Sequence, residues 1–370
     1  MRNGSAWFLA VVLFFVAGCE SPVQPVVVNY TVSFDSQGGT AVASQTIPNG
    51  GLVTTPTAPT RSGYTFGGWF KEAGAVNPWT FASDSVTGNR TLYAKWTAVV
   101  VNPSRIKIGS FNAQILGPTK VGRPNTLAVL AGVATQFDLL AIQEVGSNNS
   151  TALENTCVTV MNTFVAEMNL IAGANTYGYY RGNQYAYVYK KAVVDVLETH
   201  LYVGAMTFTY QPLVGNFRLK TGNFDFSLVT IHTSPGVAVT EVPSLHTVVN
   251  EVSAFYSEPD VIVVGDLNAD GDYYSEGSGS DLAGFPSTTY ITGIPNSADT
   301  TVAASSNTYD RLEMTKSLTG DFSGGWGVIR FSDLYDVSIC EGPASTAGTE
   351  AALSDHYPVW CEFYTNQDTD

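Results

Sequence analysis

The fold of this chain is decided by three short stretches: Ser354-Asp355-His356-Tyr357-Pro358-Val359, Gly265-Asp266-Leu267-Asn268 and Ile142-Gln143-Glu144-Val145. In each stretch a polar cluster adjoins an apolar run. An α/β sandwich fills its interior with apolar strand residues, so polar clusters at strand ends lie at the mouth of a cleft. Carboxylate, amide and imidazole groups gathered there are the groups that metal-assisted hydrolysis of phosphate esters requires.

Length and composition indicate a folded protein of about two domains. The chain has 370 residues, of which 44% are hydrophobic and 13% are charged, and this excludes a disordered protein. Its negative charge is concentrated from position 99 onward. That segment contains 28 Asp and Glu and 12 Lys and Arg, which gives a net charge of −16. A segment with this net negative charge is not expected to attract nucleic acid over long distances. The four cysteines have no metal-ligand spacing, which argues against zinc.

The N-terminus has the pattern of an export signal. An apolar stretch from Ala6 to Ala17 is too short for a permanent membrane helix, and Val16-Ala17-Gly18-Cys19 follows it. This resembles a bacterial lipoprotein signal, which implies cleavage before Cys19, lipid on its thiol and a place in the cell envelope. An ordinary secretory signal with an incidental cysteine is the alternative. We predict a signal peptide over 1–18 and a tether over 19–29.

Outside the cytoplasm, Cys340 and Cys361 are candidates for a disulfide, with Cys157 left alone. Two free buried thiols would give the same sequence pattern.

Residues 30–98 predict a small β-rich domain. The strand signal of Tyr30–Phe34, the turn at Gln37-Gly38-Gly39 and two aromatic strands contain the runs FDSQGG, GYTFGGW and LYAKW. The segment resembles one copy of the Listeria–Bacteroides repeat, which implies a β-grasp-like module that serves as a spacer or adhesion unit. A domain this small needs its large aromatic residues for its core. We therefore expect core positions, rather than a ligand site, at Trp69, Phe70, Tyr93 and Trp96. A linker is expected over 99–104.

The remainder, residues 105–364, alternates strand and helix signals. Strands are expected at 106–111, 139–142, 185–190, 224–231, 261–265 and 359–363, and helices at 126–135, 152–168 and 245–255. Two stacked mixed β-sheets with helices on the outside satisfy this pattern, so the predicted fold is a four-layer α/β sandwich. Residues 365–370 are predicted to be a tail.

The polar residues at strand ends are the candidates for chemistry. Glu144 ends a wholly apolar strand, where a carboxylate is costly unless it meets a cation, and this makes it the first candidate metal ligand. Asp266 and Asn268 are two residues apart and share one face of an extended chain. Asp310 has an ordinary alternative, an ion pair with Arg311.

Taken together, these residues match a family pattern. Their order resembles the endonuclease/exonuclease/phosphatase superfamily across 105–364: Asn112, Glu144, His232, Asp266, Asn268, Asp310, Asp355 and His356. The likeness is closer to its pancreatic-type deoxyribonuclease branch, on the runs QYAYVYK at 184–190, IHTSP at 231–235, IPNSADTT at 294–301 and YDR at 309–311.

That resemblance implies a monomeric endonuclease acting on DNA. Glu144, with Asn112 and Asp355, is expected to hold Mg²⁺ or Mn²⁺. Asp266 is expected to orient or deprotonate the attacking water, and Asn268 to contact the phosphoryl oxygens. The same resemblance makes His356 a proton donor held by Asp310, places His232 on the other side of the phosphate, and makes Asp299 and Thr301 candidates for a structural Ca²⁺ site.

Four positions depart from the family pattern. Asn183 stands where a glutamate should support His232, and Gln114, Gly146 and Tyr210 stand where arginines are expected. Grip on phosphate and contact with the DNA groove are therefore expected to be weaker. The alternatives are a phosphodiesterase of the same superfamily that acts on lipid headgroups or small phosphoesters, and a catalytically weakened surface adhesin.

Overall fold

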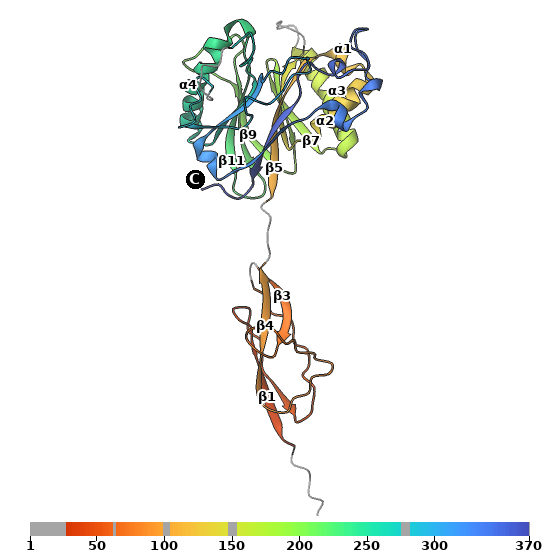
Figure 1. The fold of residues 1–370 in the computed structure, drawn as a ribbon, viewed down its shortest axis with the longest axis vertical. Helices are drawn as coiled ribbons and strands as arrows, with labels where there is room; N and C mark the ends of the chain where they lie inside the picture. Colours follow the sequence, from red (N-terminus) through yellow and green to blue (C-terminus); the bar gives the residue numbers. More distant parts are fainter. Residues whose placement is uncertain (1–26, 62–63, 99–103, 147–153, 275–281, 370) are drawn as a thin grey trace, which may run out of the picture. The chain divides into compact units, whose positions relative to one another are not determined.

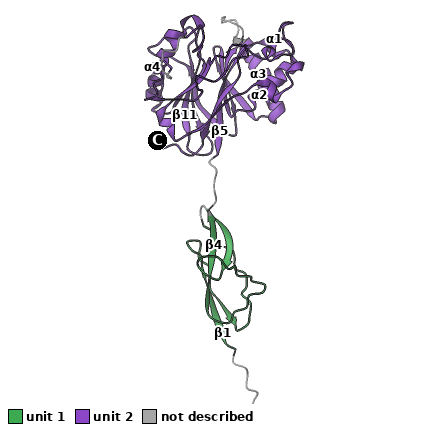
Figure 2. Cartoon of the chain, viewed as in Figure 1, with its two compact units in different colours: residues 1–101 green, residues 102–370 purple. Residues whose placement is uncertain are grey.

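The chain forms two compact units, residues 1–101 and 102–370 (Figure 2). A computed structural model describes residues 27–61, 64–98, 104–146, 154–274 and 282–369. The boundary between the units falls within the predicted linker, whereas the predicted signal peptide and Cys19 lie outside the described residues. Within the described ranges, no helix has both the length and the apolar character needed to cross a membrane.

The first unit is a four-stranded sheet in the order β2-β1-β4-β3, with bounds Gln45–Pro48, Asn29–Asp35, Arg90–Ala98 and Tyr64–Phe70. Strand β1 pairs with β4 in parallel, and the other pairs are antiparallel. Trp69 and Phe70 are buried, as predicted. Trp96 is only half-buried because it packs at the rim of the core, where its Nε1 donates to the Ser36 carbonyl at 2.8 Å. Tyr93 is also half-buried, so the prediction of a core position was wrong there.

The second unit contains two six-stranded mixed sheets. One has the order β15-β16-β5-β6-β8-β7, with bounds Phe322–Val328, Val359–Tyr364, Arg105–Leu116, Leu139–Val145, Tyr185–Lys190 and Tyr177–Gly182. The other has the order β13-β14-β12-β11-β10-β9, with bounds Tyr290–Thr292, Asp310–Thr315, Val261–Asp266, Asp225–His232, Leu213–Leu219 and Val194–Leu201.

Helices cover the outer faces of both sheets (Figure 1). The first sheet carries α1, α2 and α3, with bounds Pro118–Val121, Pro124–Ala134 and Glu154–Ala172. The second sheet carries α4, Ala238–Tyr256. A further short helix, α5, spans Phe331–Leu334. The four-layer sandwich predicted from the sequence is confirmed.

Strand alternation explains the layers, because successive side chains of a strand point to opposite faces. In β5, Ile106 and Ile108 enter the core between the sheets, whereas Phe111 and Ala113 pack on the helix side. The other central strands, β6, β11 and β12, divide their apolar residues in the same way. Three cores result: one between the sheets and one beneath each layer of helices.

The helix predicted at 245–255 begins earlier, at Ala238. A proline in a helix interior removes a hydrogen bond, and Pro243 lies within the additional part of this helix. The structure keeps Pro243 inside the helix because Ala238, Val242 and Leu245 pack together on the second sheet. Packing against the sheet outweighs the local cost of the proline.

The disulfide candidate Cys340–Cys361 was wrong. Both thiols are buried and free. Cys361 lies on β16 and points into the core between the sheets, whereas Cys340 belongs to the core beneath α2 and α3. The first sheet thus separates the two sulfur atoms. The segment predicted to be a tail packs against the second unit, because Thr365 and Asp368 are buried.

Candidate active site

The site lies at one end of the core between the sheets, where the inward-facing strand positions change from apolar to polar. In β12, Ile262 and Val264 face this core and Asp266 is the next position on the same face. In the antiparallel neighbour β14, Asp310 precedes Leu312 on the inner face and pairs with Asp266 across the ladder. Strands β5 and β11 repeat the pattern and end their inner faces with Asn112 and His232.

The Asp266 carboxylate is the centre of the site. It is 1% exposed, and its Oδ2 accepts a hydrogen bond from Asn112 Nδ2 at 2.9 Å. The same oxygen lies 3.5 Å from His232 Nε2 and 3.4 Å from His356 Nε2. Burial raises the pKa of Asp266, but the charges of His356 and His232 and the Asn112 amide outweigh it, so the pKa falls below its usual value. The carboxylate is therefore ionised at neutral pH.

His356 is held by Asp310, whose Oδ2 lies 2.7 Å from His356 Nδ1. Burial lowers the pKa of His356, yet the charges of Asp310 and Asp266 bring it well above the usual value. Burial also raises the pKa of Asp310, to about 6. At neutral pH the two form an ion pair, and His356 points a protonated Nε2 toward Asp266. Arg311 is engaged elsewhere and donates to the Thr308 and Ala269 carbonyls.

The backbone around Glu144 adopts unusual conformations. Gln114, Ile115 and Glu144 have φ angles of 42°, 57° and 59°, in a region that costs energy for residues other than glycine. The register between β5 and β6 shifts after Asn112. As a result the Ile115 amide donates to Glu144 Oε2 at 2.9 Å, and Asn112 Nδ2 donates to Oε1 at 3.0 Å. Backbone strain thus accompanies the placement of the predicted metal ligand.

At His232 Nδ1, where Asn183 replaces the glutamate expected from the family pattern, the acidic group in reach is Glu144, beyond hydrogen-bond distance. The atom is buried and has no hydrogen-bond partner among the described residues, and Glu144 Oε1 is 3.8 Å away. Tyr210, which stands in place of an expected arginine, places its ring 6.0 Å from the imidazole ring. An aromatic ring supplies no fixed positive charge for a phosphate there.

The remaining predicted residues lie further from the centre or are engaged in other bonds. Asn268 Nδ2 donates to the Thr233 carbonyl at 2.9 Å, so that one of its N–H groups is already used. Asp355 is 55% exposed, with Oδ1 3.9 Å from His356 Nε2.

The candidate calcium ligands form a separate group. Asp299 Oδ2 binds Arg330 at 3.1 Å, and Oδ1 accepts from the Thr301 amide at 3.3 Å. A calcium ion there must compete with the guanidinium of Arg330, and this site stays a prediction.

Two supporting residues were missed by the sequence analysis. Lys120 is buried, and its Nζ donates to the carbonyls of Ala113, Gln114 and Leu353 at 2.9, 2.6 and 2.8 Å. Burial lowers its pKa to about 8. Ser354 Oγ donates to the Asn112 carbonyl at 2.7 Å and accepts from the His356 amide at 3.2 Å. Lys120 does not end an apolar run, which was the signal that identified the other positions, and Ser354 was noted only as part of its stretch, without a role of its own.

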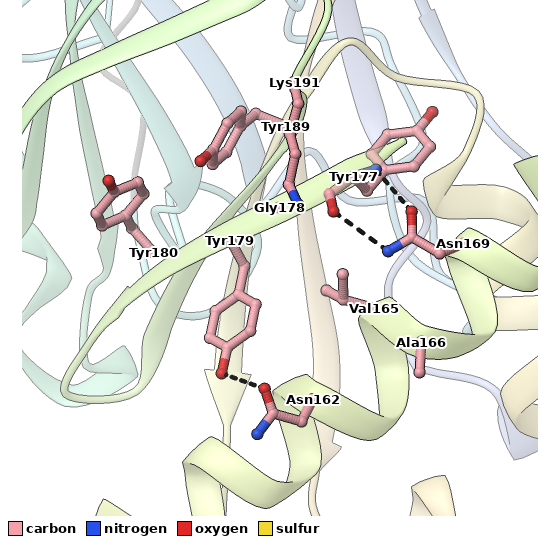
Figure 3. A pocket seen from close by; sticks show the side chains of 10 residues that line it. All are labelled: Asn162, Val165, Ala166, Asn169, Tyr177, Gly178, Tyr179, Tyr180, Tyr189 and Lys191. Atoms are coloured by element: carbon pink, nitrogen blue, oxygen red, sulfur yellow. Dashed lines mark hydrogen bonds between the residues drawn. The ribbon is translucent and has the colours of Figure 1, made fainter. Parts of the chain in front are cut away.

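A separate pocket of about 600 Å³ lies between α3 and strands β7 and β8 (Figure 3). Asn162 and Asn169 on the helix bond to Tyr179 and Tyr177 on β7. None of the predicted site residues lines it. This pocket is therefore separate from the Asp266 cluster.

Both units of the chain are similar to known protein families. The sequence model of the Endonuclease/Exonuclease/phosphatase family matches residues 109–333, and that of the Listeria-Bacteroides repeat domain matches residues 30–95. Deoxyribonuclease-1 of Bos taurus is 28% identical over 267 residues, covering 69% of this chain and 90% of that protein. Deoxyribonuclease-1-like 2 of Mus musculus is 27% identical over 282 residues, covering 74% and 98%.

Among solved structures, an endonuclease/exonuclease/phosphatase family protein from Bacteroides thetaiotaomicron is similar to this chain. It is 14% identical, with a TM-score of 0.48, and the match covers 72% of this chain and 99% of that one.

The buried Lys120 gives the first testable prediction. Lys120→Met removes the donor shared by three carbonyl oxygens and is expected to destabilise the second unit by about 2–4 kcal/mol in urea unfolding. The matched control is Lys220→Met, because Lys220 is exposed and pairs with Asp195 at the surface at 3.1 Å. That change should cost about 0–1 kcal/mol. Equal effects of the two substitutions would contradict the role given to Lys120.

Proposed function

Because the chain belongs to the endonuclease/exonuclease/phosphatase family, we propose that its second unit is a divalent-metal-dependent endonuclease that hydrolyses DNA phosphodiester bonds. The family and the deoxyribonuclease relatives support a phosphodiester hydrolase. The observation that carries the finer proposal is the pair of imidazoles flanking one ionised, buried carboxylate, with distances of 3.5 and 3.4 Å to Asp266 Oδ2.

Each group has a role in attack on a phosphodiester. Asp266 orients the water and accepts its proton, since its low pKa keeps it ionised. His356, held by Asp310, presents a positive charge and a proton to the oxygens that become more negative in the transition state. His232 lies on the other side of Asp266 and is positioned to contact the same phosphate. Asn268 has a second N–H that is available to a phosphoryl oxygen.

The predicted metal ligands have side chains that fit a hard divalent cation. Glu144 supplies carboxylate oxygens that are partly exposed, Asn112 supplies an amide beside them, and Asp355 supplies an exposed carboxylate near His356. Such donors suit Mg²⁺ or Mn²⁺. When bound, the ion neutralises charge on the phosphate in the transition state. It also offsets the local effect of a segment with a net charge of −16.

Nicking of supercoiled plasmid by residues 27–370 tests this proposal. We expect nicking with Mg²⁺ plus Ca²⁺, none with EDTA, and a loss of about 10²- to 10⁴-fold in His356→Ala. His200→Ala is the matched control, because His200 lies on β9 and contacts Glu198 and Tyr256 instead of the Asp266 cluster.

Three outcomes count against the nuclease. A folded protein that does not nick DNA but releases phosphate or phosphocholine from small or lipid phosphoesters would favour the other branches of the superfamily. Loss of metal dependence in every assay would favour an adhesin. Nicking that is equally strong in His356→Ala would reject the role given to that histidine.

The pH dependence of nicking follows from the Asp310–His356 pair. Activity should rise through about pH 6, where Asp310 becomes ionised, and fall only well above the usual histidine pKa, where His356 loses its proton. Asp310→Asn removes the charge that raises the pKa of His356, so the alkaline limb should move to lower pH and the limb near 6 should disappear. Rate profiles of the two proteins measure this, and identical profiles would contradict it.

We also propose that the full chain is anchored to the bacterial envelope through lipid on Cys19, with the repeat unit as a spacer. The motif Val16-Ala17-Gly18-Cys19 supports this. In a bacterial host fed an alkyne fatty acid, the full chain should be labelled in the membrane fraction and Cys19→Ser should not. Cys157→Ser is the control that keeps its label. An unlabelled, secreted wild-type protein would indicate an ordinary signal peptide.

A further inference from the structure

Three buried aspartates meet far from the active site. Asp260 precedes β12, Asp321 precedes β15, and Asp368 lies after β16; they are 1%, 3% and 8% exposed. One carboxylate oxygen of each lies within 4.8 Å of those of the others. A calcium ion holds its oxygen ligands at about 2.3–2.6 Å, so two ligands of one ion are at most about 5 Å apart. The three oxygens satisfy this limit.

The cluster is distinct from the Asp266 site. Asp260 and Asp266 stand at opposite ends of β12, six residues apart, and a strand rises about 3.3 Å per residue. The two residues are thus about 20 Å apart along the strand. No residue that we place in the hydrolytic mechanism belongs to the second cluster.

Hydrogen bonds do not fully satisfy the Asp321 carboxylate. Its Oδ1 is buried and has no hydrogen-bond partner among the described residues. Burial and the negative charge of Asp368 raise the pKa of Asp321 to about 6. Burial and Asp368 likewise raise the pKa of Asp225, which adjoins the cluster. Buried carboxylates gathered in this way are costly unless a cation or a proton joins them.

Main-chain bonds hold Asp368 in place. The Asn223 amide donates to the Thr365 carbonyl at 3.0 Å, and Asn223 Nδ2 donates to the Asp368 carbonyl at 2.5 Å. The Thr365 amide donates to the Ser104 carbonyl at 3.0 Å, and the Tyr364 amide donates to the Asp321 carbonyl at 2.7 Å. The approach of the three carboxylates is therefore built into the fold of residues 364–368.

We propose that Asp260, Asp321 and Asp368 bind one divalent cation, and that calcium is the ion that fits, in a structural site that fastens the segment after β16 to the second unit. Three carboxylates from separate loops suit calcium, which accepts irregular oxygen cages, whereas magnesium demands near-ideal octahedral geometry and keeps several waters. The absence of sulfur and imidazole from the cluster argues against zinc. The ion joins β12, β15 and the C-terminal segment.

Thermal unfolding of residues 27–370 in EDTA and in CaCl₂ tests the site. In EDTA, Asp321→Asn should melt at a higher temperature than the wild type, because it removes one of the crowded charges. In calcium the order should reverse, because only the wild type gains from the ion. Asp368→Asn should behave in the same way, so the test does not depend on the folding of a single variant.

Equilibrium dialysis with radioactive calcium counts the sites directly. Asp321→Asn and Asp368→Asn should each bind one calcium fewer than the wild type, or bind it at least about tenfold more weakly. Glu144→Gln and Asp299→Asn are the controls, because they alter the other candidate cation sites and should leave this calcium bound. The proposal is overturned if calcium leaves the melting order unchanged or if both aspartate variants bind as many ions as the wild type.

Plasmid nicking separates this inference from the proposed function. Asp321→Asn should retain nicking, since its carboxylate lies far from Asp266. An enzyme that never nicks DNA can still show the calcium-dependent reversal.

Discussion

The architecture of the active site depends on one constraint: the Asp266 carboxylate is ionised although it is buried between two sheets. A buried charge costs several kcal/mol unless cationic or hydrogen-bonding groups surround it. The second sheet supplies His232 from β11, and the first sheet supplies Asn112 from β5 and His356 from the turn before β16. The strands that carry these groups must therefore pair in one register within each sheet, because a slip of one residue would turn these side chains away from Asp266.

The strained backbone next to the site follows from the same requirement. A regular strand would place Glu144 on the face of Ile142, beneath the helices, yet its carboxylate bonds to Asn112 on the inner face. The positive φ of Glu144 changes its direction, and the turn at Gln114 and Ile115 brings an amide to it. Lys120 binds the carbonyls of Ala113 and Gln114 and so supports this conformation from behind.

Much of the fold and of the site could be predicted because both follow the period of two along strands. Asp266 and His232 end runs in which apolar residues alternate faces, and this pattern is visible in sequence. Strand β14 was missed because its residues Asp310, Arg311 and Glu313 are charged, although each is fully buried and meets partners from distant segments. The role of Lys120 was missed for a similar reason: its partners are main-chain oxygens, which leave no mark in the sequence.

A buried carboxylate lies at each end of β12, and the groups around the two carboxylates differ. At one end, imidazoles and an amide compensate Asp266, and the imidazoles can lose or gain protons during a reaction. At the other end, Asp260 lies close to the carboxylates of Asp321 and Asp368, and proteins neutralise such a group with a metal ion or with protons. A site that must move protons needs histidine, whereas a site that must hold loops together needs only fixed charge. The difference in side chains therefore suits the proposed catalytic role at one end of the strand and the proposed structural role at the other.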